Sequence, residues 1–81
     1  MRTIRVDLTP HYTTFPPGEV SVGDRLMLVR LGGPKDGEVY GRAVIRWISP
    51  NGDITFKITK GSPGGVIKKG EVHTITPEMA G

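Results

Sequence analysis

Hydrophobic and polar residues alternate along several short segments of the chain. In residues 3–8, Ile4, Val6 and Leu8 fall on one face of an extended chain and polar residues fall on the other. This period of two is typical of a half-buried strand. Similar segments predict further strands at residues 25–31, 39–48, 54–60 and 71–76. No segment repeats its apolar residues with the period of a helix, and glycines and prolines separate the segments. The pattern therefore predicts an all-β domain.

A tight turn is predicted between the third and fourth strands, at the Asn-Gly pair of residues 51–52. Asn-Gly supplies the two positive-φ residues of a type I′ hairpin with a two-residue loop. A hairpin closed there pairs Trp47 with Phe56 and Ile45 with Ile58, so that the large apolar side chains share one face. This register favours a core position for the indole of Trp47. The alternative is an exposed anchor in a binding surface.

The opposite face of this hairpin is polar and basic. Its residues are Arg42, Val44, Arg46, Thr55, Lys57 and Thr59. The same register sets Arg46 directly against Lys57, where two like charges are unfavourable. The favoured interpretation is that these long side chains extend into solvent, where salt screens their repulsion. The alternative is that the strip binds an anion, either a phosphate backbone or an acidic protein surface. In that case Lys60, Lys68 and Lys69 extend the strip.

Residues 9–18 contain three prolines and no periodic pattern, so they are predicted to form a long loop. Tyr12 and Phe15 lie in this loop. Their rings either fold back over one end of the domain or are displayed as an adaptable contact surface. Together with Tyr40, they are the candidate residues for binding a protein partner.

Two segments resemble the SH3-like barrel family. Residues 19–28 (EVSVGDRLML) are similar to the acidic, apolar and Gly-Asp pattern that leads into a strand of SH3 domains. Residues 65–72 (GVIKKGEV) resemble the closing turn Gly-x-Ile-Pro-x-x-Tyr-Val of that family. The resemblance implies a small, five-stranded, antiparallel SH3-like barrel over residues 1–76, with a long loop after its first strand. We expect residues 77–81 to be a disordered tail.

The peptide groove of SH3 domains is not matched. Val39, followed by Tyr40, stands where the resemblance places the groove tryptophan, and Lys68 and Glu71 replace the proline and tyrosine of the closing turn. Proline-rich peptides pack into slots between aromatic side chains. We therefore do not expect this chain to bind them.

A second resemblance, to the KOW-type motif of translation and transcription factors, overlaps the first. It is carried by Val22, Gly23, Asp24, Gly32, Lys35, Gly37, Gly41 and Val44. An insertion around residues 33–36 stretches the glycine spacing relative to that motif. The resemblance implies an SH3-like barrel that contacts RNA or polymerase.

The residue types present limit the chemistry of the chain. It has no cysteine, and its only histidines, His11 and His73, lie near opposite ends of the sequence, whereas zinc needs three or four convergent ligands. Residues 32–38 have the glycine spacing of a phosphate loop, but Glu38 replaces the lysine that must reach the phosphates. No serine lies in a recognisable nucleophile motif. We therefore expect no enzyme activity, no cofactor and no metal.

The net charge of +3, from 11 basic and 8 acidic residues, permits contact with nucleic acid without requiring it. No apolar run approaches the roughly 20 residues of a membrane helix, and the N-terminal segment lacks the apolar core of a signal peptide. We expect a cytoplasmic protein with no membrane partner, in agreement with the lack of cysteine.

Two functions remain as hypotheses. The favoured one is a non-enzymatic protein-binding module, either a stand-alone adaptor or an accessory protein of a bacterium or a phage. The chain resembles the proteins of short phage reading frames. It would bind a protein partner through Tyr12, Phe15 and Tyr40, or form a homo-oligomer along an open strand edge. The alternative is a nucleic-acid-binding barrel. Its binding residues would be Arg42, Arg46, Lys57, Lys68 and Lys69.

Overall fold

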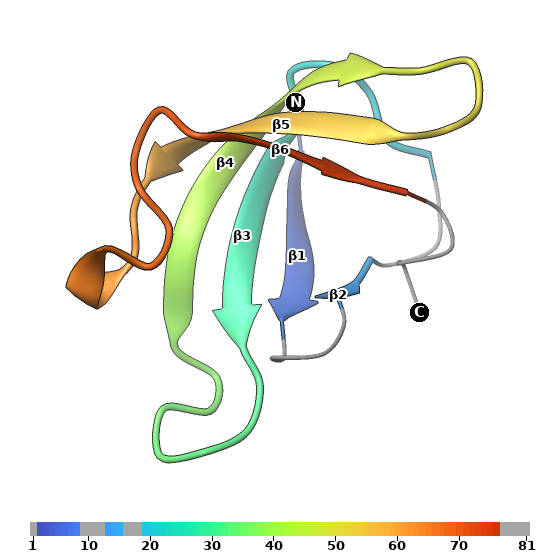
Figure 1. Ribbon diagram of the computed structural model, residues 1–81. Helices are drawn as coiled ribbons and strands as arrows, with labels where there is room; N and C mark the ends of the chain where they lie inside the picture. Colours follow the sequence, from blue (N-terminus) through green and yellow to red (C-terminus); the bar gives the residue numbers. More distant parts are fainter. Residues whose placement is uncertain (1, 9–12, 16–18, 77–81) are drawn as a thin grey trace.

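The computed structural model describes residues 2–8, 13–15 and 19–76. Six strands and one short 3-10 helix make up its regular structure (Figure 1). In chain order they are β1 Thr3–Leu8, β2 Thr13–Thr14, β3 Arg25–Arg30, β4 Val39–Ile48, β5 Ile54–Lys60, η1 Pro63–Gly65 and β6 Val72–Ile75. The five predicted strands are confirmed to within one residue at each end, and so is the all-β class. The two-residue strand β2, inside the predicted loop, is an addition.

All six strands belong to one sheet with the order β2-β1-β3-β4-β5-β6. The pairs are antiparallel except β1 and β3, which run parallel from Thr3 beside Arg25 to Leu8 beside Arg30. The sheet is therefore mixed, and the prediction that it is antiparallel throughout is wrong. Parallel neighbours need a long connection, and residues 9–24 supply one that returns the chain to the end where β1 began. The sheet is also open, so a closed barrel is not confirmed.

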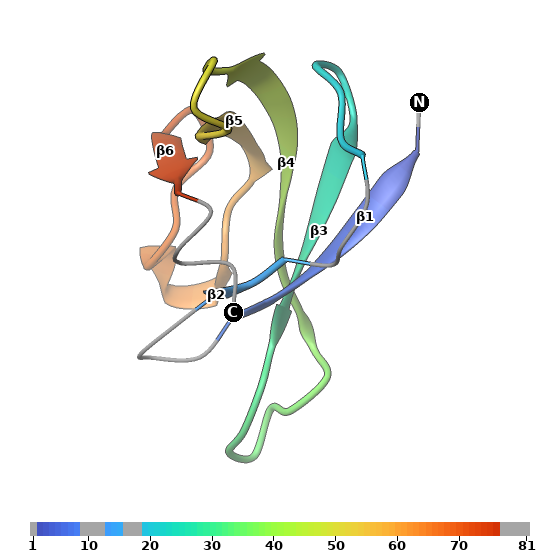
Figure 2. The same ribbon diagram turned by 90° about the vertical axis from the view of Figure 1, so that its right-hand side faces the viewer.

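The sheet curves around a single hydrophobic core. Figure 2 shows β4 bending along its length, so that β5 and β6 lie across the interior from β1 and β3. The buried cluster is Ile4, Val6, Leu26, Leu28, Ala43, Ile45, Phe56, Ile58 and Ile75. Every strand except the short β2 contributes to it, at alternate positions, as the period of two predicted. The faces of these strands that point away from this cluster form the outer face of the sheet.

The turn between β4 and β5 has a three-residue loop in place of the predicted two-residue one. The N–H of Gly52 donates to the carbonyl of Ser49 at 2.9 Å, and the N–H of Ser49 donates to the carbonyl of Asp53 at 2.9 Å. Gly52 has a φ of 90°, whereas Asn51 has a negative φ. These features describe a type I turn followed by a glycine bulge. The prediction of a type I′ turn is therefore wrong, although its location is right.

The longer loop and a β-bulge at Arg46 change the register of the hairpin. Ile48 pairs with Ile54 and Trp47 pairs with Thr55, so this end of the hairpin is shifted by one residue from the predicted register. On the other side of Arg46, Ile45 pairs with Phe56, which is a shift of two residues. A shift by one residue exchanges the two faces of a strand, and a shift by two restores them. Ile45 therefore remains in the core, while Trp47 is turned to the outer face.

The indole of Trp47 is accordingly 55% exposed. The prediction that it packs in the core against Phe56 is wrong, because Ile48 and Ile54 take the place beside the core that the predicted register left to the indole. The predicted opposition of Arg46 and Lys57 is also wrong, since Arg46 is the bulged residue and Lys57 faces Val44.

Candidate functional site

The outer face of the sheet collects basic side chains from three neighbouring strands. Val44 in β4 pairs with Arg25 of β3 on one side and with Lys57 of β5 on the other. Arg25 and Lys57 are exposed, and Val44 between them is half-buried. This cross-strand row brings two cations together whose positions in the sequence are far apart.

A second basic row lies beside the first, two residues earlier in β4. Arg42 pairs with Met27 of β3 and directly with Lys60 of β5. Arg42 and Lys60 are both exposed. A direct cross-strand pair of like charges is unfavourable. The pair of Arg42 with Lys60 was not predicted, and it is distinct from the predicted pair of Arg46 with Lys57, which does not form.

We call Arg25, Arg42, Lys57 and Lys60 the basic face. The Lys68-Lys69 pair adjoins it through the backbone at Gly61, the residue after Lys60. A Cβ added to Gly61 would lie 3.4 Å from the Cα of Lys68 and 3.2 Å from the nitrogen of Lys69. Glycine permits this close approach because it has no side chain. Lys68 and Lys69 are themselves exposed.

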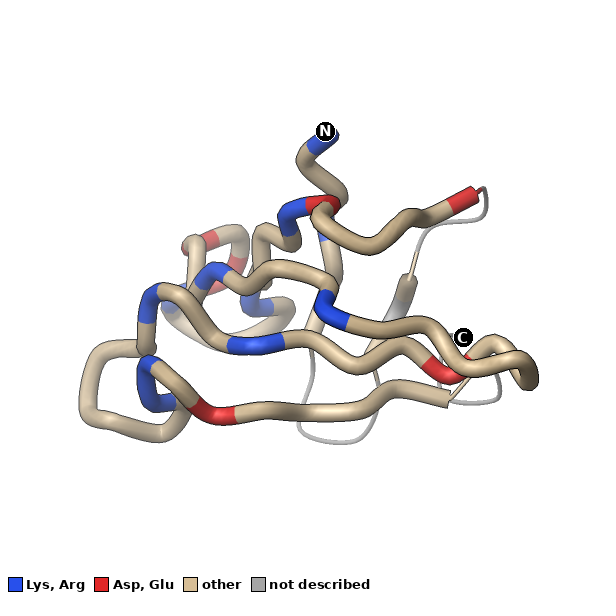
Figure 3. The backbone as a smooth tube through the Cα atoms, turned by 90° about the horizontal axis from the view of Figure 1, so that it is seen from above, with Lys and Arg blue, Asp and Glu red and all other residues tan. Residues whose placement is uncertain are grey.

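The three strands that carry the basic face contain no Asp or Glu. Seen from above, Lys and Arg positions recur along the sheet, whereas Asp and Glu positions lie mostly in the connections between strands (Figure 3). Within the described part of the chain, the ion pairs join Arg2 to Asp24, Arg5 to Asp7 and His73 to Glu71. None of them neutralises a residue of the basic face, so its charges are available to an external anion.

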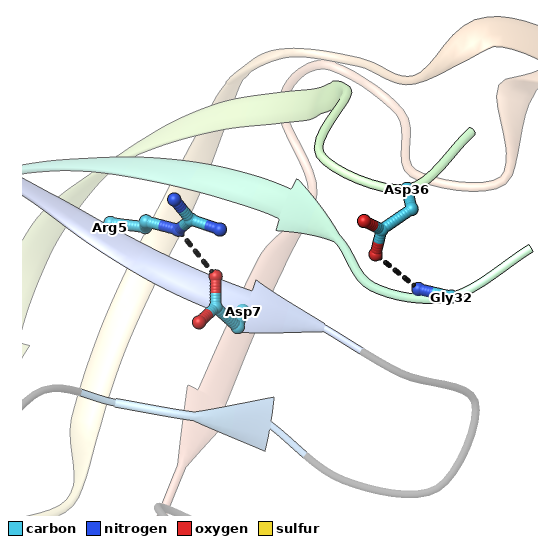
Figure 4. Close-up of polar contacts among 4 residues, drawn as sticks. All are labelled: Arg5, Asp7, Gly32 and Asp36. Carbon is cyan, nitrogen blue, oxygen red and sulfur yellow. Dashed lines mark hydrogen bonds and ion pairs between the residues drawn. The ribbon is translucent and has the colours of Figure 1, made fainter.

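Arg5 is a basic residue of the same sheet whose charge is neutralised within the chain. Its Nε donates to Oδ1 of Asp7 at 2.7 Å, across two residues of β1 (Figure 4). We therefore exclude Arg5 from the basic face although it lies on the same sheet. In the loop after β3, Oδ1 of Asp36 accepts a hydrogen bond from the N–H of Gly32 at 2.7 Å (Figure 4). That carboxylate holds the loop and does not bear on the basic face.

Of the predicted nucleic-acid residues, Arg42 and Lys57 lie in the basic face, and Lys68 and Lys69 adjoin it. Arg46 is exposed in the bulge of β4. Lys60, expected only as an extension of the strip, is a full member. Arg25 was missed, because its place beside Val44 depends on the pairing of β3 with β4, which the alternation pattern does not specify.

Of the three residues predicted to bind a protein partner, the structure describes Phe15 and Tyr40. Tyr12 lies outside the described residues. Phe15 is half-buried and packs against the core, which for this ring is the first of the two arrangements considered. Tyr40 is half-buried, and the guanidinium of Arg30 lies 5.0 Å from the centre of its ring.

Tyr40 lines a cavity of about 650 Å³ at the end of the sheet where β1 and β3 stop. Its lining includes Leu8, Arg30, Leu31, Pro34, Lys35 and Tyr40. Tyr40 is also an extra residue in β4, because Leu28 pairs with Gly41 and Val29 with Val39. The cavity is mainly apolar with two basic groups, and it lies apart from the basic face.

One carboxylate has a shifted pKa, and its role is structural. Asp24 is 5% exposed, immediately before β3, and its Oδ2 accepts a hydrogen bond from the N–H of Ser21 at 2.9 Å. That hydrogen bond, with the backbone and the guanidinium of Arg2, lowers the pKa of Asp24 against the opposing effect of burial. The ionised side chain thus closes the turn that leads into β3.

Within residues 2–8, 13–15 and 19–76, no group of three or more His, Cys, Asp and Glu side chains is placed to hold a metal ion. His73 stacks on Phe56 with ring centres 5.8 Å apart and contacts Glu71, while His11 lies outside the described residues. The same part of the chain has no helix with the length and apolar character needed to cross a membrane.

Comparison of the chain with family models, with curated proteins and with solved structures gives no significant match in any of the three.

Proposed function

We propose that this chain is a binding module that contacts nucleic acid through the basic face. The observation that carries the proposal is the pairing of β3, β4 and β5, which gathers Arg25, Arg42, Lys57 and Lys60 on one exposed surface without a neutralising acid among the described residues. Two of these cations, Arg42 and Lys60, are held side by side at a cost to stability, which an anion between them would remove.

A phosphate backbone fits this surface better than a small anion does. Lysine and arginine side chains that neutralise several phosphates release condensed counterions, and this release supplies most of the affinity of sequence-independent binding. Cations spread over two cross-strand rows suit a ligand with repeated charges. Contacts of this kind position a nucleic acid but do not read its sequence. We therefore propose binding with little sequence preference.

The resemblance to SH3-like and KOW-type domains supports this proposal only as an analogy. It rests on the motifs at residues 19–28, 22–44 and 65–72. We propose that the open sheet is a variant of that architecture. A relation to SH3-like domains would have to explain the parallel pairing of β1 with β3.

The first test is the salt dependence of binding, measured by fluorescence anisotropy with a labelled oligonucleotide. The logarithm of the association constant should fall linearly with the logarithm of salt concentration, by about 0.7 to 0.9 per phosphate contact. Four contacts then predict a slope of about −2.8 to −3.6. Affinity that does not change with salt, or no binding at low salt, would contradict the proposal.

Charge-reversal variants locate the surface. Lys57→Glu combined with Arg42→Glu should remove most of the affinity and reduce the steepness of the salt dependence. Lys35→Glu is a control of matched chemistry, since Lys35 is exposed in the loop after β3 and outside the basic face. An equal loss of affinity per charge in Lys35→Glu would show that only the net charge matters, and would remove the basic face as the site.

Lys60→Glu separates binding from folding. It replaces a like-charge pair with Arg42 by an opposite-charge pair, so unfolding should require about 0.2–1 kcal/mol more free energy. Binding should nevertheless weaken. If Lys60→Glu binds nucleic acid as well as the unchanged chain does, Lys60 is not part of the site. A chain that binds no nucleic acid but self-associates or binds a protein would support the other hypothesis.

A further inference from the structure

We propose that Trp47 is a stacking platform for an unpaired base, so that the ligand of the basic face is single-stranded nucleic acid. This inference rests on the proposed function and adds the class of nucleic acid. Its starting point is the indole itself, which lies on the same outer face as the cations and is 55% exposed.

The side chains next to Trp47 leave its ring uncovered on the side of β5 and β6. Its cross-strand partner is Thr55, and the partner of Thr55 on β6 is Thr74. The hydroxyl oxygens of these two threonines lie 3.1 Å apart, so they are occupied with one another. Two short side chains therefore form a low surface beside the indole, over which a flat ligand can extend.

Cations lie immediately around this surface. Arg46, the chain neighbour of Trp47, is exposed in the bulge, and Lys57 lies two residues beyond Thr55 on the outer face of β5. Successive outer positions of one strand are about 6.6–6.8 Å apart. Lys57 is thus close enough to hold a phosphate of a nucleotide whose base lies on Trp47.

An exposed aromatic ring beside lysine and arginine is the combination that binds single strands, because each base of a single strand offers an aromatic face and each nucleotide offers a charge. The bases of a duplex already stack on one another and cannot also cover the indole. The charge and the aromatic ring together therefore select an unpaired strand. The apolar side chain of Val72, opposite Lys57 on β6 and exposed, continues the surface.

Trp47 is the only tryptophan of the chain, so its fluorescence reports on this site alone. We would titrate the full chain with oligothymidine of about 12 nucleotides and with a duplex of equal length. The single strand should quench the fluorescence and bind more tightly than the duplex at the same salt concentration. Quenching by the duplex with equal or greater affinity would overturn the inference.

Variants at Trp47 distinguish stacking from simple attraction of charges. Trp47→Ala should weaken single-strand binding about 5- to 150-fold while the duplex affinity changes little. Trp47→Phe keeps an aromatic face and should retain most of the affinity. Thermal unfolding of each variant checks that the fold is intact, which we expect for an exposed side chain.

The outcomes separate this inference from the proposed function. If Trp47→Ala binds the single strand normally while Lys57→Glu with Arg42→Glu does not, the stacking is wrong and the basic face still binds nucleic acid. If the unchanged chain binds neither oligonucleotide, both proposals fail. In that case, burial of the Trp47 ring only when a protein partner is added would point to a protein-binding anchor.

Discussion

The indole of Trp47 shows how the position of one residue depends on its neighbours in the sheet. A tryptophan is among the largest sources of burial energy available to a small domain, and this chain has only one. The fold nevertheless leaves it 55% exposed and packs the side chains of Ile48 and Ile54 against the core. An exposed indole is free to contact a ligand, which is the role proposed for Trp47.

Asp24 illustrates the opposite case, a charged residue that is buried because the backbone surrounds it with donors. The N–H of Ser21 donates to its carboxylate, and the guanidinium Nε of Arg2 lies 3.7 Å from Oδ2. The main chain beside it pairs with β4, since the N–H of Ile45 donates to the carbonyl of Asp24 at 2.9 Å. The side chain therefore stabilises the point where β3 starts to pair with β4.

We predict that Asp24→Asn lowers the thermal midpoint of unfolding by several degrees near neutral pH. The pKa of Asp24 is lowered in the folded chain, first by the hydrogen bond from Ser21. The unfolded chain therefore takes up the proton more readily, and the stabilisation is fully present above the ordinary aspartate pKa of about 4. It is lost as the pH falls below that value toward the folded pKa.

The difference in thermal midpoint between Asp24→Asn and the unchanged chain should therefore shrink between pH 6 and about pH 3. Calorimetry or circular dichroism at a series of pH values measures it. Asp53→Asn is the control, because it removes the same charge from a loop next to β5. A difference that stays constant over this range would show that the carboxylate of Asp24 does not act through its ionised form.

At the scale of elements, the β4–β5 hairpin carries both the exposed indole and three of the four residues of the basic face. Its geometry depends on where two extra residues are accommodated, one in the loop and one in the bulge at Arg46. Each bulge strengthens the local twist of a strand. A third irregularity, at Arg42 and Ala43, brings Lys60 opposite Arg42. These irregularities bend the sheet and at the same time determine which side chains reach the outer face.

The turn type predicts a clear asymmetry between two neighbouring alanine variants. Gly52→Ala places a side chain at a φ of 90° and should destabilise the chain by about 1–2 kcal/mol. Asn51→Ala should change the stability by less than about 0.5 kcal/mol, because the φ of Asn51 is negative. Chemical denaturation of the two variants measures both values. Comparable losses in both would indicate the type I′ turn, which needs a positive φ at each residue.

At the scale of the whole molecule, the sheet has a protected middle and two open edges. β3 and β4 have hydrogen-bonded neighbours on both sides, whereas β2 and β6 stand at the ends of the strand order. The edge strands are short, of two and four residues, which limits pairing with a second chain. An edge of this kind is nevertheless the place where a homo-oligomer would form.

Hydrogen exchange should follow this arrangement. The amides of β3 and β4 should exchange slowest, because they open only when the core does, and those of β6 should exchange much faster. Exchange measured by NMR at two protein concentrations tests this. Protection of β6 equal to that of β4 at both concentrations would indicate a covered edge and hence a closed barrel. Protection of β6 only at the higher concentration would indicate self-association through that edge.

Much of the fold could be predicted from the sequence because alternation is a local property. A strand such as β1 shows its two faces in six consecutive residues, and Ile4 and Val6 are buried as their positions required. The basic character of the β4–β5 outer face was predicted in the same way. The parallel pairing of β1 with β3 could not be predicted, since either direction of β3 would have buried Leu26 and Leu28.

The sequence by itself therefore determined which segments are strands, which of their faces is apolar, and that lysine and arginine gather on the other face. Only the tertiary structure decided the register, because a bulge or one more residue in a loop exchanges the two faces of a strand at little local cost. The packing of Ile48 and Ile54 against the core selected the arrangement in which Trp47 is exposed. Arg25 joined the basic face for a similar reason, since its neighbours were set by strand pairing and not by its place in the chain.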